Sequence, residues 1–498
     1  MNKEIKTNVV INLIRTITMT LLSFITFPVV CRILGDSMLG HFSWATSFVY
    51  YFIVLSKISI PNIAIRECAK VKDDPNKLSI KVQEFFIMQA VMTLLSFGLL
   101  TLIVFSVPAF NGELNQTLIF ILSLNFLTSI FAFEWVFTAL EKQTYLAIRS
   151  IIILGIVDVL IFVFVKRPDD VYTYTFITTL TTILTVISNI FYLPKLVKFR
   201  KTEKYNFKQY LSSLLILFCI SLCAAIYSKT DSFILGLIDT SKKSVGSYSV
   251  GMKGVDIIIS FFISLSSVFM PKASQYYHLN DNNNFLKINK YSTNICLLIA
   301  VPAIALMSTL ATPITSLISG SYDSSSYNDA STILIALTLL MVTYSLSNNI
   351  YTQILIPQKR EKIYLYSMII GSVFNIGLSL LFGIVILKDR PAVGVAIATS
   401  MSDLIIFIFL LSFTWKTSNK MLFNINNLKI LILGIILGLV SYFVGPLLFD
   451  AFSQTNSIQI SYIFEILCIV GISIIIYFVG LIVSKEKITS NIFFKKEY

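Results

Sequence analysis

The stretch "LSSLLILFCISLCAAIYSKTDSFILG", Leu211 to Gly236, is apolar over most of its length and ends in a short polar interruption. As a helix, the part before Lys229 rises about 27 Å, close to the thickness of the hydrocarbon core of a bilayer. Lys229 and Asp231 then lie toward one end of that helix. The stretch therefore predicts a helix that crosses a membrane and carries two charged residues near one surface.

The rest of the chain repeats this pattern. Of its 498 residues 56% are hydrophobic and only 13% are charged, which is too apolar for a soluble domain of this size. The sequence predicts an all-α integral membrane protein with about fourteen transmembrane helices and no soluble domain. The predicted spans are 9–30, 41–62, 84–107, 117–139, 146–165, 172–193, 210–235, 247–270, 291–318, 331–355, 363–387, 393–413, 430–449 and 460–483.

Targeting and cysteine signals are sparse. The N-terminal residues show no cleavage site, so the first helix is expected to be retained. The six cysteines indicate neither a disulfide framework nor a metal site, and no cofactor is implied. A P-loop is also absent from the sequence, which argues against ATP hydrolysis.

Basic residues indicate the orientation. With alternate joints taken as cytoplasmic, 28 of the 39 Lys and Arg fall in inner segments and 7 in outer joints. This asymmetry follows the positive-inside rule and predicts that both termini are cytoplasmic. The net charge of +13 then reflects orientation and contact with anionic membrane lipids rather than nucleic-acid binding.

An internal repeat divides the chain. "RILGDSMLGHFSWA" (32–45) corresponds to "FILGLIDTSKKSVGSYSVG" (233–251), with Gly40 matching Gly246 at an offset of 206. "EKQTYLAIRS" (141–150) matches "KREKIYLYS" (359–367) at an offset of 217. Six helices per repeat make the two repeats parallel, as in transporters that place the substrate path between their halves. The last two helices are an addition.

The expected domains follow from this repeat. Two joints are basic with interleaved apolar residues, and each fits either an amphipathic surface helix or a solvated linker. The domains are a first six-helix lobe (1–194), a cytoplasmic linker (195–209), a second lobe (210–414), a second cytoplasmic linker (415–429) and two further helices with a cytoplasmic tail (430–498).

Polar residues form stripes on three predicted helices. Their cations are Arg15, Lys57 and Lys253, and a charge within a spanning helix normally faces a cavity or a partner. We expect a basic, hydrated cavity, although helix packing and snorkelling of the lysines are the alternative explanation. The expected polar lining is Asn12, Ser23, Tyr50, Asp256, Ser260 and Ser264.

Four other intramembrane polar residues are candidates for a coupling or structural role. Lys229 and Asp231 point about 200° apart on a helix and cannot pair with each other. Asp158 and Asn375 are related by the repeat offset of 217, so each half has a polar residue in its fifth helix.

The motifs "RILGDSMLGHFSWATSF", "IPNIAIRECAK" and "SKTDSFILG…VGSYSVGMK" resemble the polysaccharide-type (oligosaccharide) flippases of the multidrug/oligosaccharidyl-lipid/polysaccharide flippase superfamily. The resemblance covers about residues 5 to 415, and departs from the family at Ala64, where glycine is expected. It implies a non-enzymatic flippase of the cytoplasmic membrane for undecaprenyl-pyrophosphate-linked oligosaccharide, acting as a monomer, with a polysaccharide polymerase as a possible partner. Related lipid II flippases hold the pyrophosphate with cations on their first, second and eighth helices, where Arg15, Lys57 and Lys253 lie here.

Two alternatives remain open on the sequence. A cation-coupled multidrug exporter of the same superfamily would use the same helices, but its cavity should be acidic rather than basic. A membrane-embedded glycan polymerase or ligase would need a catalytic outer loop, and every outer joint here is short.

Overall fold

Residues 3–197, 199, 205–320, 326–454 and 457–484 are described by the computed structural model, and among them the secondary structure is helical throughout, without strands. By their packing the helices form two compact units, residues 1–246 and 247–498. The predicted all-α fold is therefore confirmed.

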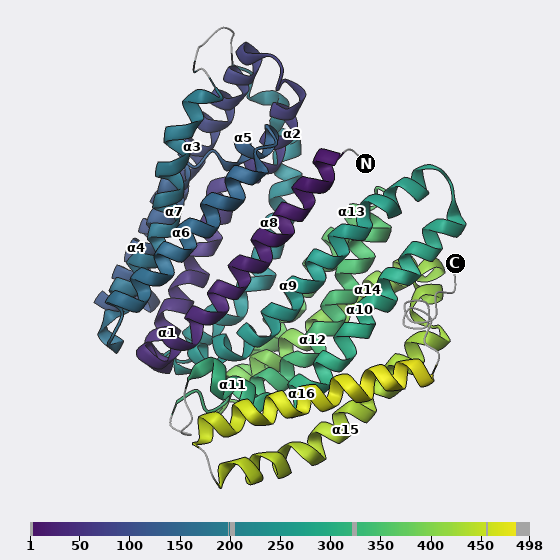
Figure 1. The fold of residues 1–498 in the computed structure, drawn as a ribbon. Coiled ribbons are helices and arrows are strands. Elements are labelled where there is room, and N and C mark those ends of the chain that lie inside the picture. The colour runs from purple at the N-terminus through teal and green to yellow at the C-terminus, as the bar shows by residue number, and fades with distance from the viewer. Residues whose placement is uncertain (1–2, 198, 200–204, 321–325, 455–456, 485–498) are drawn as a thin grey trace. The chain divides into compact units, whose positions relative to one another are not determined.

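Unit 1 contains eight α-helices, and α1 is at its centre, packed against α3, α4, α6 and α8. Figure 1 shows α3, α4, α6 and α7 side by side in this unit. The helices are α1 (Lys3–Lys57), α2 (Ile60–Lys70), α3 (Pro75–Ser106), α4 (Glu113–Ser129), α5 (Glu134–Ala139), α6 (Gln143–Phe164), α7 (Val171–Tyr192) and α8 (Lys208–Ile238). Short 3₁₀ turns η1 (Pro108–Phe110), η2 (Pro168–Asp170) and η3 (Leu193–Lys195) join them.

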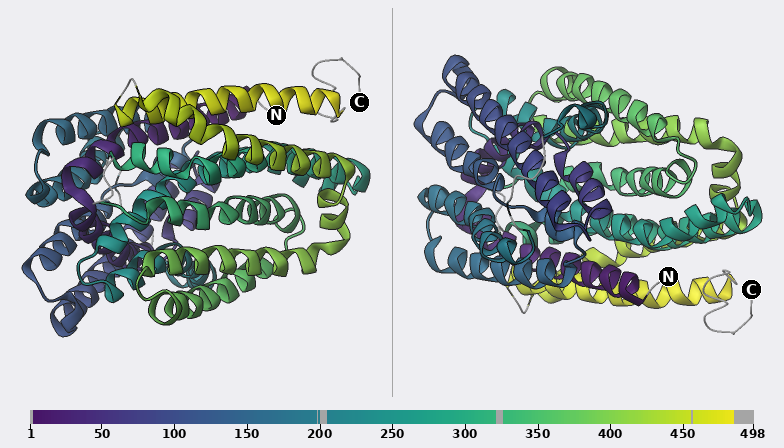
Figure 2. Two further views of the ribbon diagram at one scale, coloured as in Figure 1. Left: turned by 90° about the horizontal axis from the view of Figure 1, so that it is seen from below. Right: turned by 90° about the horizontal axis from the view of Figure 1, so that it is seen from above.

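Unit 2 is built around α12 and α14, with α10 against both of them and α13 against α14. The C-terminal pair α15 and α16 pack on each other at one margin of this unit, and Figure 2 shows them there in both further views. The elements are α9 (Lys243–His278), α10 (Asn282–Thr309), α11 (Ala311–Ser319), α12 (Ala330–Ile350), the π-helical η4 (Tyr351–Leu355), α13 (Glu361–Leu380), the π-helical η5 (Leu381–Ile386), α14 (Pro391–Leu422), α15 (Ile425–Ser453) and α16 (Ile458–Val483).

The number of membrane crossings agrees with the sequence. Twelve helices of the described residues are long and apolar enough to span a bilayer, and one of these, Arg15–Lys70, has 56 residues and is too long for a single crossing. Its backbone breaks at Gly35, where φ is 71°, so it holds two spans. Together α4 and α5 form a further span broken at Phe133. The total is consistent with the fourteen predicted.

The ends of the repeats differ slightly from the predicted joints. The α14 helix continues to Leu422 and α15 begins at Ile425, because "SFTWKTSNKML" (412–422) contains no proline or glycine that would end a helix. Most of the predicted linker 415–429 is therefore helical. In the other linker, residues 198 and 200–204 lie outside the described residues, and α8 packs against α1 as part of unit 1.

The predicted repeat is visible in a reciprocal contact within residues 36–246. The backbone of Gly40 lies against the carbonyl of Lys242, and that of Gly246 lies against the carbonyl of Asp36. Asp36 and Lys242 are separated by 206 positions, as are the two glycines. Corresponding residues of the two repeats thus make the same contact with each other.

Candidate functional site

Two helix breaks in unit 1 position its most polar cluster. Residues with left-handed φ separate α1 from α2 at Ser59 (58°) and α4 from α5 at Phe133 (49°). Lys57 precedes the first break and Glu134 follows the second, and α2 packs against α5. Irregular backbone at membrane depth occurs where it is buried in protein or lines a wet cavity. These breaks therefore bring two charged side chains to one region.

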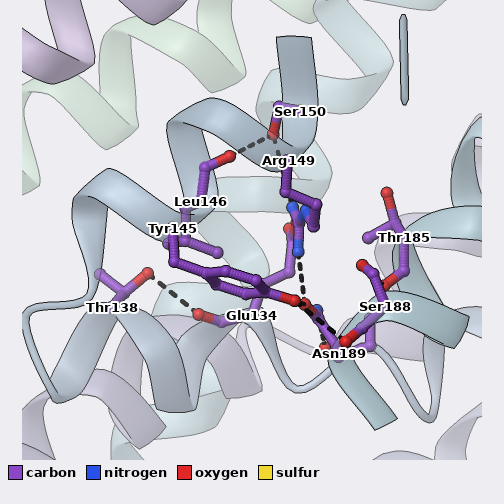
Figure 3. A network of polar contacts seen from close by, with 10 residues as sticks. Glu134, Thr138, Tyr145, Leu146, Arg149, Ser150, Thr185, Ser188 and Asn189 are labelled. Atoms are coloured by element: carbon purple, nitrogen blue, oxygen red, sulfur yellow. Dashed lines mark hydrogen bonds and ion pairs between the residues drawn. The ribbon is translucent and has the colours of Figure 1, made fainter. Parts of the chain in front are cut away.

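An arginine that we did not single out from the sequence lies at the centre of this cluster. Arg149 of α6 forms an ion pair with Glu134, and its Nη1 donates a hydrogen bond of 2.6 Å to Asn189 Oδ1. Tyr145 donates to the same oxygen at 3.1 Å, and Asn189 Nδ2 donates to the carbonyl of Ala132. Figure 3 shows these side chains converging from α5, α6 and α7. Arg149 is thus held on three sides.

Two of the predicted cavity cations belong to the same cluster. The carboxylate of Glu134 interacts electrostatically with both Arg15 and Lys57. Both cations are part-buried on α1. Arg149 therefore forms an ion pair with Glu134, and Arg15 and Lys57 interact electrostatically with the same carboxylate, an excess of positive charge that suits an anionic ligand.

The polar residues near the end of α8 form a second group in unit 1. Lys229 Nζ lies over the ring of Tyr50, 5.4 Å from its centroid, which brings together two of the predicted site residues. The hydroxyls of Tyr51 and Thr230 are 3.2 Å apart, and Asp231 is buried next to them and interacts electrostatically with Tyr51. Lys229 and Asp231 therefore have different surroundings, as their helical angle predicted.

The remaining candidates of unit 1 lie elsewhere on its helices. Ser23 is part-buried on α1, about two turns beyond Arg15. Asp158 is buried on α6, where its carboxyl shares a hydrogen bond with Thr26. Asn12 belongs to α1, but its side chain lies outside the described residues.

Unit 2 holds the other predicted residues, most of them on α9. Lys253 is part-buried and Asp256, one turn further, is exposed. Ser264 donates a hydrogen bond of 3.0 Å to the carbonyl of Ser260. Tyr344 interacts electrostatically with Asp256 and with Asp403 of α14, a buried carboxyl that we did not identify from the sequence.

Asn375, the repeat counterpart of Asp158, is fully buried on α13. Its amide donates to Thr399 Oγ1 on α14 at 3.4 Å. Among the described residues no three His, Cys, Asp or Glu side chains come together as a metal site.

Comparison with known proteins establishes the family. The sequence profile described as "Polysaccharide biosynthesis protein" matches residues 5–277, more than half of the chain. The chain belongs to this family. The profile described as "MatE" matches residues 217–381.

One relative and two proteins of known structure are similar to this chain over most of its length. A putative O-antigen transporter of Escherichia coli (strain K12) is 23% identical over 81% of this chain and 94% of its own. The lipid II flippase MurJ in its inward closed conformation has a TM-score of 0.69 at 22% identity, covering 97% and 98% of the two chains. An inward-facing multidrug resistance MATE family transporter has a TM-score of 0.60 at 14% identity, covering 83% and 98%. These structures show that the chain has the same fold as the lipid II flippase and the MATE transporter.

Proposed function

We propose that this protein is a flippase that moves undecaprenyl-pyrophosphate-linked oligosaccharide repeat units from the inner to the outer leaflet of the cytoplasmic membrane for cell-surface polysaccharide synthesis. The observation that carries the proposal is the ion pair of Arg149 with Glu134 in unit 1, together with the electrostatic interaction of Arg15 and Lys57 with the same carboxylate. A diphosphate needs several cations, and hydrogen bonds to charged groups are strong ones.

The comparisons support the same function. The family is described by polysaccharide biosynthesis, and one relative is named as a putative O-antigen transporter. One of the solved structures of similar fold is a lipid II flippase, a protein named for a lipid substrate. An exporter of cationic drugs is a poorer fit, because a cluster with an excess of positive charge repels such substrates.

We assign the predicted site residues to the two parts of the substrate, the pyrophosphate and the sugars, by their chemistry. We assign the pyrophosphate to Arg15, Lys57 and Lys253, whose charges complement it. Hydroxyl and amide side chains hydrogen-bond sugar hydroxyls. This role falls to Asn12, Ser23, Tyr50, Ser260 and Ser264, with Asp256 beside Lys253.

Orientation and partners complete the proposal. Both termini are cytoplasmic, as the basic residues of the inner joints indicate. The transport unit is a monomer that alternates access between its repeats, and a polysaccharide polymerase uses the units it delivers. As a transporter it performs no covalent chemistry.

The test is the accumulation of lipid-linked oligosaccharide on the inner leaflet in cells that carry Arg15→Gln, Lys57→Gln or Lys253→Gln. Each charge-assisted contact contributes roughly 1.5–3 kcal/mol, so each variant should export glycan about tenfold or more slowly at equal membrane abundance. Lys57→Arg and Lys253→Arg should retain more activity than the Gln variants. Export at the wild-type rate by all three Gln variants would refute the cationic binding site.

A further inference from the structure

The two partners of the Arg149–Glu134 ion pair differ greatly in exposure. The side chain of Arg149 is 5% exposed, whereas that of Glu134 is 48% exposed. Arg149 is also fixed by Asn189 and lies near the ring of Tyr145, 5.8 Å from its centroid. The guanidinium is therefore a preorganised element, and the carboxylate is the partner that can move away.

The guanidinium also has unused bonding capacity. Its Nε is buried and, within the part of the chain that the structure describes, has no hydrogen-bond acceptor. A buried donor without an acceptor is unfavourable, because it has given up its hydrogen bonds to water without replacing them. A planar guanidinium can bind phosphate oxygens through two parallel N–H groups. The pair with Glu134 thus leaves Arg149 incompletely satisfied in a way that a larger oxyanion would correct.

Glu134 interacts with other cations besides its ion-pair partner Arg149. Its carboxylate acts electrostatically on Arg15 and on Lys57, and Arg149 acts on Arg15 with the same sign of charge. Like charges repel one another, and a carboxylate that interacts with each of them offsets that repulsion. Glu134 supplies that anion when no substrate is bound.

The internal repeat shows that the common scaffold does not need this pair. At the offset of 217, the counterparts of Glu134 and Arg149 are Tyr351 and Tyr366. Both are uncharged, and Tyr351 instead stacks on Tyr364 with ring centroids 3.8 Å apart. A pair required by the helix packing of each repeat would be expected in both halves. Its presence in one half favours a role in binding.

We propose that Glu134 is an internal counter-ion that the diphosphate of the substrate displaces, and that Arg149 then becomes a further substrate-binding residue. This inference rests on the proposed function. The exposed carboxylate holds the cations together in the empty protein, and the incoming diphosphate, with its greater charge, takes its place on Arg149, Arg15 and Lys57. Glu134 therefore weakens substrate binding, which favours release after translocation.

The experiment titrates inorganic pyrophosphate into the purified full-length protein by calorimetry at fixed ionic strength. Nanodiscs of neutral phosphatidylcholine exclude anionic lipid headgroups as a competing source of phosphate. Glu134→Gln should bind about tenfold more tightly than the wild type, because the competing charge is lost while the amide still accepts from Arg149. A misfolded variant cannot produce this gain. Arg149→Gln should bind about tenfold more weakly, and Arg149→Lys should fall between the two.

Glu141→Gln is the matched control, since it removes one carboxylate from an exposed pair with Lys72 (3.1 Å) and should leave binding unchanged. If Arg15→Gln and Lys57→Gln weaken binding but Glu134→Gln does not tighten it, the counter-ion inference is refuted and the flippase proposal stands. If no form of the protein binds pyrophosphate, both are refuted.

Discussion

Asp158 is the residue whose surroundings decide between a structural and a coupling role. Its carboxyl is buried on α6 next to Thr26, and Thr26 Oγ1 already donates to the carbonyl of Leu22 at 3.1 Å. The hydroxyl of Thr26 can also accept a hydrogen bond, so a side chain with a donor at residue 158 can keep this contact. An amide supplies such a donor, and the repeat counterpart Asn375 is an amide.

We therefore expect Asp158→Asn to export glycan within about twofold of the wild type, because its Nδ2 donates to Thr26. Asp158→Ala should lose stability by about 1 kcal/mol, since it removes the hydrogen bond between the two side chains while Thr26 keeps its bond to the carbonyl of Leu22. Export by each variant is measured alongside its abundance in the membrane. Loss of export by Asp158→Asn at normal abundance would instead identify a carboxylate required for energy coupling.

At the scale of single residues, the sequence predicted the cations on the first, second and eighth spans but not Arg149, which lies at the centre of the cluster in unit 1. Arg15, Lys57 and Lys229 stand out because each interrupts an apolar run. Arg149 lies near the start of α6 and in the first turn of the predicted span 146–165, where charged residues are usual, so it does not stand out. The signal that identifies it is tertiary, because Glu134 comes from a different helix.

The helix breaks were also only partly predictable from local sequence. The break after Lys57 has a sequence signal in Pro61, because proline is favoured in the first turn of a helix and so marks the start of α2. The break at Phe133 lies in "TSIFAFEW" (128–135), which has neither glycine nor proline. Its left-handed backbone depends on the packing of α5 against α2 and was not predictable from local sequence.

Two helix N-caps give the elements a pH dependence. Asp74 caps α3 by accepting from the N–H groups of Asn76 and Lys77 at 3.1 and 3.2 Å. Asp281 caps α10 by accepting from the N–H of Asn284 at 3.0 Å. Hydrogen bonds from the Lys77 N–H and from the Asn284 N–H, respectively, hold the pKa of each carboxyl below its usual value. The caps stand at equivalent points of the two repeats.

A carboxyl with a lowered pKa in the folded state stabilises the protein above its unfolded pKa of about 4, and the effect disappears as pH falls through the folded value. We expect Asp74→Asn and Asp281→Asn to melt below the wild type at pH 7. The difference should shrink as pH falls below about 4. Thermal melting of purified protein across this range measures it. A difference that does not change with pH would show that the charge of the caps contributes nothing.

The reciprocal glycine contact is the element-scale feature that links the repeats. A Cβ at Gly40 would lie 1.9 Å from the carbonyl oxygen of Lys242, and one at Gly246 would lie 2.1 Å from that of Asp36. Both neighbours are backbone atoms, which cannot rotate away. Gly40→Ala and Gly246→Ala should each destabilise the protein by about 1–3 kcal/mol through overpacking.

Gly98→Ala is the control for this prediction. Gly98 lies within α3 and a Cβ there would meet nothing within 4 Å, so alanine should be neutral or stabilise the helix. Thermal melting compares the three variants. Equal stability of Gly40→Ala and Gly98→Ala would show that the contact at Lys242 is loose enough to accept a side chain.

On the scale of the whole molecule, the spans and the repeat were the most predictable features. A membrane span needs about 20 consecutive apolar residues to cross the hydrocarbon core, and its backbone must be helical because unsatisfied backbone groups are costly in lipid. Such apolar runs can be recognised in the sequence alone. Residues related by the repeat offset also make equivalent contacts in the structure, as Gly40 and Gly246 do. The interruptions of the spans were not predictable in the same way, because they depend on neighbouring helices.

Orientation is the whole-molecule property that charge alone predicts. The joint between α2 and α3 and the helix ends beside it carry five basic residues, Arg66, Lys70, Lys72, Lys77 and Lys81, whereas the joint between α3 and α4, residues 107–112, has none. The α3 helix has 32 residues and rises about 48 Å, enough to separate the two joints by a bilayer. The positive-inside rule then places Asp73 in the cytoplasm and Asn111 outside.

Cysteines at these two exposed positions test the orientation with an impermeant maleimide. Asn111→Cys should be labelled in intact cells, and Asp73→Cys only after the membrane is permeabilised. The unmodified chain provides the background, because its own cysteines include the exposed Cys219. Labelling of Asp73→Cys but not of Asn111→Cys in intact cells would mean that both termini lie outside, and that the proposed direction of transport is wrong. Labelling of both positions in intact cells would mean that α3 does not cross the membrane, which its length and apolar composition contradict.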